Sequence, residues 1–117
     1  MSSARVQVLL WGAQRISAMV LALCVVVHLL TMIVAVRSGL SAAEILGRTQ
    51  GSTAWLLFYA VFVLAVAVHA PIGLRGIVAE ISQWRGRSLD VCTGLAGVAL
   101  AVWGLRAVLA VFSGGGA

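Results

Sequence analysis

Charged residues are scarce in this sequence: it has no lysine, only three acidic residues and 9% charged residues overall. Such a composition cannot give a folded domain a water-compatible surface, so it excludes a soluble globular protein. The eight cationic residues are arginines without a basic cluster that would follow a nucleic-acid backbone, so nucleic acid is not an expected partner. Cys24 and Cys92, the only cysteines, fall in apolar stretches whose spacing suggests neither a disulfide nor a zinc site. We expect both to be small buried side chains.

Apolar residues, by contrast, make up 62% of the chain and gather in three long runs, at about 11–36, 54–80 and 91–112. Each run reaches the ~20 residues that a helix needs to cross a hydrocarbon core of ~30 Å. None alternates polar and apolar residues, which excludes transmembrane strands. The sequence therefore predicts an all-α fold, an integral membrane bundle of three transmembrane helices that forms one domain over residues 1–117.

The arginines indicate which way the chain crosses the membrane. Five lie near the start of the first run or around the connection between the second and third runs: Arg5, Arg15, Arg75, Arg85 and Arg87. The first connection carries Arg37 and Arg48, which Glu44 partly offsets. Because positive residues favour the cytoplasmic side, we expect a cytoplasmic N-terminus. The first run is too long for the core of a cleaved signal peptide and is expected to stay as a helix.

The connection between the first two spans carries its own helix signals. Gly39 is a helix stop, Ser41 suits an N-cap, and Glu44, three residues on, completes a capping box. These residues predict a short surface helix. Trp55 and Tyr59 then suit an aromatic belt at the far side of the membrane.

Polar and small residues mark the sides of the spans that face protein. In the first span they recur at spacings of three and four and share one stripe: Ser17, Leu21, Cys24, His28 and Thr31. In the third span a stripe of small residues predicts close helix packing: Gly94, Gly97, Ala101 and Gly104. In the second span one face carries six residues, Phe62, Ala65, His69, Gly73, Gly76 and Glu80. Three of the six, the alanine and the two glycines, have side chains no larger than a methyl group.

His69 is the first candidate for chemistry. A histidine in hydrocarbon must find a hydrogen-bond partner or bind a metal, because an unsatisfied imidazole is costly there. Gly73 and Gly76 lie one and two turns away and leave room for a flat group such as a porphyrin, and Pro71 predicts a modest kink beside the histidine. Haem iron in electron carriers commonly takes imidazole ligands. We therefore interpret His69 as an axial ligand of a haem iron.

Two arginines lie at a depth that suits the polar groups of a cofactor. Arg75 follows His69 by six residues, roughly 9 Å along the helix, which is about the reach of a haem propionate. Alternatively, Arg75 extends to the lipid headgroups and binds no ligand. Arg15 in the first span offers the same choice: it contacts a propionate or a quinone oxygen, or it extends to the headgroups.

His28 is the second histidine inside a span. Counting residues from the charged positions at the cytoplasmic boundary places it roughly 4 to 11 Å farther from that boundary than His69. This offset argues against one iron held by both histidines. It allows a second haem iron that His28 binds together with a partner chain. The alternative is that His28 hydrogen-bonds a neighbouring helix.

The second span resembles that of a known family, the membrane-anchor subunits of succinate dehydrogenase and fumarate reductase, the complex II type of respiratory enzyme. His69-Ala-x-x-Gly73-x-Arg75, followed by an acid at Glu80, is similar to the haem-ligand helix of those anchors. The likeness covers all three spans and their order, and it is most specific over the ten or so residues from His69.

The first span resembles the same family. Gln14-Arg15-Ile16-Ser17 is similar to the start of the first helix of those anchors, where the arginine and serine region borders the quinone pocket. The spacing from Gln14 to His28 resembles that of the di-haem anchors, in which such a histidine binds the distal haem.

The resemblance implies a cytochrome b subunit, a single membrane-anchor domain of a succinate:quinone oxidoreductase in a bacterial-type inner membrane. It implies one or two haem b groups, bound by His69 and His28 and shared with a second membrane-anchor subunit, and quinone as a substrate near Arg15, Ser17 and Glu80. Glu80 would relay protons to quinone. FAD and the iron–sulfur clusters would belong to the flavoprotein and iron–sulfur subunits, because nothing in this chain resembles a flavin fingerprint or a cysteine cluster set.

Two residues depart from the family pattern, and two other functions stay open. Gly76 and Ile81 stand where some anchors have a histidine or tryptophan and a tyrosine, which argues against a quinone site formed by this chain alone. A haem-free structural anchor would use both histidines to bond neighbouring helices. A small transporter would also place ionisable groups in the membrane, but three spans, no inverted repeat and no mid-membrane carboxylate argue against it.

Overall fold

The computed structural model describes residues 3–114, and all the regular structure within that range is helical. Four helices follow one another: α1 Ala4–Arg37, α2 Ala42–Thr49, α3 Thr53–Ser82 and α4 Arg87–Phe112. α1, α3 and α4 are each long and apolar enough to cross a membrane, whereas α2 has eight residues. The predicted all-α fold with three spans is confirmed.

Serine caps mark the starts of α1 and α2. The backbone N–H of Val6 donates to the Ser3 hydroxyl oxygen at 3.2 Å, so α1 begins at Ala4 and includes residues that the hydropathy pattern leaves outside the first span. α2 has the predicted capping box: the Glu44 N–H donates to the Ser41 hydroxyl at 3.2 Å, and the Ser41 N–H donates to the Glu44 carboxylate at 3.0 Å. α2 is thus the predicted surface helix.

The turn between α3 and α4 is short because two residues take positive φ. Gln83 ends α3 with φ 61°, and Gly86 precedes α4 with φ 96°. A glycine adopts that conformation without steric cost, so α4 begins at Arg87, four residues before the predicted boundary.

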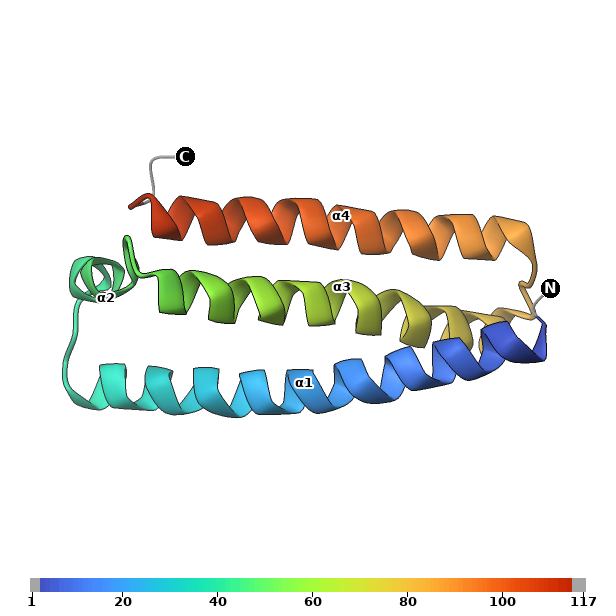
Figure 1. Cartoon of the computed structure of the whole chain (residues 1–117), viewed down its shortest axis with the longest axis horizontal. Coiled ribbons are helices and arrows are strands. Elements are labelled where there is room, and N and C mark those ends of the chain that lie inside the picture. The colour runs from blue at the N-terminus through green and yellow to red at the C-terminus, as the bar shows by residue number, and fades with distance from the viewer. Residues whose placement is uncertain (1–2, 115–117) are drawn as a thin grey trace.

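α3 lies between α1 and α4 and packs against both (Figure 1). We name the two ends of the bundle by residues of α3. At the Arg75 end, α1 and α4 begin and α3 ends; at the Trp55 end, α1 and α4 end, α2 lies across and α3 begins (Figure 1). At the Trp55 end the Gly51 N–H donates to the carbonyl of Phe112 at 2.8 Å, which ties the α2–α3 connection to the last turn of α4.

The predicted polar stripe of α1 faces α3. Ser17 and Cys24 are 6% and 4% exposed, and His28 is half-buried. Met19 and Leu23, on other faces of the same helix, are more than 60% exposed. The direction predicted for the stripe is confirmed.

Glycines let α3 and α4 approach closely. A Cβ at Gly104 would lie 2.5 Å from Cγ1 of Val63, and one at Gly97 would lie 3.0 Å from the carbonyl oxygen of Ala67. Both distances are shorter than an ordinary van der Waals contact. The predicted packing role is therefore confirmed for these two glycines, but not for Gly94, which has no such neighbour within 4 Å in residues 3–114.

Most side chains of the spans are exposed in the isolated chain. Leu89, at 1% exposed, is the largest fully buried side chain of the described residues. Cys24 is buried as predicted, but the prediction was wrong for Cys92, which is exposed because it lies on the side of α4 away from α3. Lipid or other protein chains must cover such surfaces.

Candidate functional site

His28 of α1 is held against α3 by Tyr59 and Phe62. Its Nδ1 lies 3.1 Å from the Tyr59 hydroxyl oxygen, and its ring meets the rings of Tyr59 and Phe62 edge-to-face at centroid distances of 5.7 and 5.9 Å. A bond at Nδ1 leaves Nε2 as the nitrogen for another partner. The hydrogen bond to a neighbouring helix, one of the two roles considered for His28, is present. Iron binding by His28 stays a prediction.

His69 of α3 has a buried Nδ1 with no hydrogen-bond partner among the described residues. Its Nε2 is not buried within the chain. Across the interface, Oε1 of Gln14 in α1 is likewise buried and unpartnered. The α1–α3 interface therefore contains one imidazole nitrogen and one amide oxygen that both lack a hydrogen bond.

Gln14 occupies part of the space that the sequence predicts to be open beside His69. Its amide nitrogen is 3.2 Å from the position that a Cβ of Gly73 would take, and Gly73 lies one helical turn from His69 on the same face. Gly76, one turn farther on, has no atom of another helix among the described residues within 4 Å of its Cβ position. Room for a flat group beside this face is thus found at Gly76 and not at Gly73.

The two histidines lie at different depths in the bundle. Gln14 meets Gly73 and His28 meets Tyr59, so fourteen residues separate the two contacts along each helix. Since Tyr59 precedes His69 by ten residues, the depths of the two histidines differ by roughly 15 Å at 1.5 Å per residue. This separation exceeds the predicted offset, and one iron cannot bind both imidazoles of this chain.

Arg75 pairs with an acid that the sequence reasoning missed. Its Nε donates to Oδ1 of Asp90 in α4 at 2.5 Å, and the two side chains are 26% and 40% exposed. Six residues rotate the helix by about 120° relative to His69, so Arg75 faces α4 instead of the side that carries His69. The available signal was Asp90 itself, the only acid in the first turn of α4 and at the same end of the bundle as Arg75.

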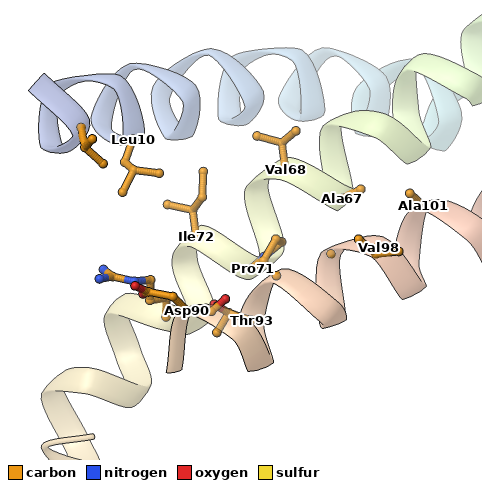
Figure 2. Close-up of a pocket in the computed structure, with 13 residues that line it drawn as sticks. Leu10, Ala67, Val68, Pro71, Ile72, Asp90, Thr93, Val98 and Ala101 are labelled. Atoms are coloured by element: carbon orange, nitrogen blue, oxygen red, sulfur yellow. The ribbon is translucent and has the colours of Figure 1, made fainter. Parts of the chain in front are cut away.

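A groove of about 560 Å³ lies beside this ion pair, between the start of α1, the second half of α3 and the first half of α4. Figure 2 shows Leu10 of α1 and Ile72 of α3 on one side of it and Asp90 and Thr93 of α4 on the other. Its walls are apolar except at Arg75, Asp90 and Thr93. The groove suits a molecule with an apolar body and a polar head.

The other predicted site residues are spread over the half of the bundle near the Arg75 end. The guanidinium of Arg15 lies 5.5 Å from the centroid of the Trp11 ring on its own helix. The buried Ser17 hydroxyl donates to the carbonyl of Gln14 at 3.1 Å, and Glu80 is exposed. Among the described residues, the pocket that Ser17 lines includes neither Arg15 nor Glu80. The chain by itself does not bring these three residues together.

Comparison with known proteins agrees with the arrangement of helices. A family model described as the succinate dehydrogenase/fumarate reductase transmembrane subunit matches residues 1–105, which include α1, α2, α3 and most of α4. No curated protein and no solved structure matches the chain significantly. The match extends over far more than half of the chain, and three helices are able to span a membrane. The chain is therefore a multi-pass membrane protein that belongs to the family of succinate dehydrogenase/fumarate reductase transmembrane subunits.

Proposed function

We propose that this chain is the haem b-binding anchor subunit of a succinate:quinone oxidoreductase in a bacterial-type inner membrane. Its Arg75 end would lie on the cytoplasmic side and dock the flavoprotein and iron–sulfur subunits. Those subunits would hold FAD and the iron–sulfur clusters and carry out the dicarboxylate chemistry. The observation that supports haem binding is the buried, unpartnered Nδ1 of His69 inside a membrane span.

The surroundings of His69 fit an axial ligand. A ligating histidine binds the metal through one ring nitrogen and usually donates a hydrogen bond from the other, which fixes the tautomer. Gln14 supplies a buried oxygen without a partner in the same interface, so it is the acceptor that this chain offers to the Nδ1–H. Nε2 is then the nitrogen left for the iron. Haem bound there would supply a one-electron carrier, with its second axial ligand from the partner anchor subunit.

His28 has two proposed roles that the Tyr59 contact supports in different ways. The Tyr59 hydroxyl engages Nδ1, which orients the ring and leaves Nε2 for a second haem at the Trp55 end. In a haem-free anchor, the same bond would only join α1 to α3. The depth offset between the histidines requires that a second haem, where present, be separate from the first.

For quinone, we propose that this chain contributes the groove beside Arg75. Arg75 would donate a hydrogen bond to a quinone carbonyl, and the apolar walls would take the tail. Arg15 and Ser17 would approach from α1, and the exposed Glu80 would exchange protons with water. Since these residues do not share a pocket within the chain, the second anchor subunit would complete the site.

Haem counting in the purified complex tests the assignment. In His69→Ala we expect the pyridine haemochrome assay to show one haem fewer per complex while the flavoprotein and iron–sulfur subunits still co-purify. His28→Ala should keep that haem and lose a second one where the wild-type complex has two. Cys24→Ala changes a buried position on the same α1 stripe and should keep all haem.

Two results would contradict this proposal. Full haem content in His69→Ala would rule out His69 as the ligand. A wild-type complex without a reducible b-type absorption band would favour the haem-free anchor.

A further inference from the structure

Arg106 lies in the last third of α4 and has no partner among the described residues. Its side chain is exposed, and it has no hydrogen bond, ion pair or ring contact with any other described residue. It precedes the last residue of α4, Phe112, by six positions, which places it roughly 9 Å inside the helix end. Lipid tails offer nothing that could pair with a guanidinium, so an arginine at this depth normally faces protein or water.

Arg106 points away from the rest of the chain. Gly97 and Gly104 face α3, and Arg106 follows them by nine and two residues, which corresponds to about 180–200° around the helix. The residues that share its side of α4 are also exposed, at 52–64% of their surface, and together with it we call them the Arg106 face: Leu95, Val102, Arg106 and Leu109. Their spacing of seven, four and three residues forms a continuous stripe of the kind that receives another helix.

Extension of the side chain to the headgroups is opposed by helix geometry. α4 runs from the Arg75 end to the Trp55 end, so the membrane boundary nearest Arg106 lies towards the helix C-terminus. Cα–Cβ bonds in an α-helix tilt towards the N-terminus, so the Arg106 side chain leaves the backbone towards the membrane interior and would have to turn back to reach the nearest headgroups. The geometry therefore favours a partner within the membrane.

No described residue of this chain supplies an anion to Arg106, so its partner must come from elsewhere. None of the chain's three acids lies at the depth of Arg106. Asp90 pairs with Arg75 and Glu80 lies at that same end, whereas Glu44 is at the Trp55 end but in the connection beyond the spans, where the α2 capping box holds it. A second copy inserted in the same direction would carry its acids at the same depths. The occupant therefore comes from a different chain.

We propose that the Arg106 face docks a membrane-spanning helix of another chain of the complex, which presents an aspartate or glutamate side chain to Arg106 within the membrane. This inference rests on the proposed function, because it requires a second anchor chain, and it identifies the face on which that chain lies. The pair would fix the rotation of the two helices, since rotating either helix would separate the two charges. Truncating either side chain would leave the other charge in lipid.

Photocrosslinking in the intact complex tests the proposal. A photoreactive amino acid replaces Val102, one turn from Arg106. In a second sample, which serves as the control for an exposed position on another helix, it replaces Leu23, which is 67% exposed on α1. Mass spectrometry identifies the crosslinked chain and the depth of its acids. We expect Val102 to crosslink to a membrane chain with a carboxylate at that depth, and Arg106→Leu to lower this yield about tenfold or more. Arg37→Leu, an exposed arginine at the end of α1, should leave it unchanged.

The remaining outcomes separate the alternatives. Neutralising the identified carboxylate should reproduce the Arg106→Leu result, and Arg106→Lys should retain part of the yield. Crosslinks to lipid only, to a second copy, or at an unchanged yield in Arg106→Leu would overturn the proposal. Loss of haem in Arg106→Leu with an unchanged crosslink would also overturn the proposal, because it would indicate that Arg106 contacts a haem propionate. These failures leave the anchor function standing, whereas failure of the wild-type subunits to co-purify would refute the proposed function itself.

Discussion

Replacing Gly104 by alanine should push α3 and α4 apart. The added Cβ would lie 2.5 Å from Cγ1 and 3.1 Å from Cγ2 of Val63. Carbon atoms pack best at about 3.5–4.0 Å, so the helices must separate locally by about 1 Å or Val63 must leave its preferred rotamer. Overpacking of this kind costs about 1–3 kcal/mol, and the helix propensity of alanine offsets about 1 kcal/mol of it. We expect Gly104→Ala to lower the free energy of unfolding by up to about 2 kcal/mol.

Gly94→Ala is the matched control, because Gly94 lies in the same helix and the part of the chain that the structure describes places nothing within 4 Å of its Cβ position. Both variants gain the same propensity, so the difference between them measures the clash alone, about 1–3 kcal/mol. Titration of the full chain with SDS in mixed micelles, followed by far-UV circular dichroism, gives the two free energies. Values for Gly104→Ala and Gly94→Ala that agree within about 0.5 kcal/mol would refute the close approach described here.

Three other contacts make predictions of their own. Alanine substitutions of Arg75 and Asp90, alone and together, should change the free energy of unfolding with a coupling energy of about 1–2 kcal/mol, between the values for exposed and buried ion pairs. Strictly additive changes would contradict the ion pair. Tyr59→Phe removes the hydroxyl bonded to His28 and should lower the free energy of unfolding by about 1 kcal/mol in the same SDS titration; an unchanged value would argue against that bond. The backbone N–H of Ser41, the N-cap of α2, donates to the Glu44 carboxylate and lowers the pKa of that carboxyl. The ionised Glu44 therefore stabilises α2 fully above the ordinary carboxyl pKa, and this stabilisation is lost as the pH falls through the lowered pKa. Amide exchange in α2, corrected for intrinsic rates, should therefore accelerate below about pH 4 in the wild type and lose this pH dependence in Glu44→Gln; equal pH profiles for the two would exclude the effect.

Hydropathy predicted the three spans because lipid imposes a minimum apolar length, and it predicted the start of α3 to within one residue, but it did not predict where α1 and α4 begin. α1 extends to Ala4 because Ser3 caps it, and α4 extends to Arg87 because Gly86 allows the turn. Those residues lie outside the apolar runs. α2 was predicted at the level of single hydrogen bonds because a capping box depends only on residues three positions apart, Ser41 and Glu44.

The candidate site shows which geometric information a single sequence contains. Counting along a helix predicts depth, so the offset between His28 and His69 was predicted in direction and only underestimated in size. The partner that a side chain meets depends on how neighbouring helices are rotated and in which register they pack. Gln14 against Gly73 and Arg75 against Asp90 both depend on that register, and no local pattern in one helix sets it.

Pro71 and Gly97 show how a proline in one helix restricts a position in another. Pro71 has no N–H for the carbonyl of Ala67, and a Cβ at Gly97 would lie 3.0 Å from that oxygen and 3.0 Å from the proline ring. With only hydrogens there, Gly97 can offer its Cα–H to the freed carbonyl where no water is available. The order of mutation therefore matters. Pro71→Ala restores the backbone N–H donor of α3 and removes the proline ring, so a later Gly97→Ala brings its Cβ against fewer atoms. In the reverse order, the Gly97→Ala variant still contains Pro71 and its Cβ clashes with the ring. Substitutions at positions 71 and 97 should therefore occur together among descendants of this chain.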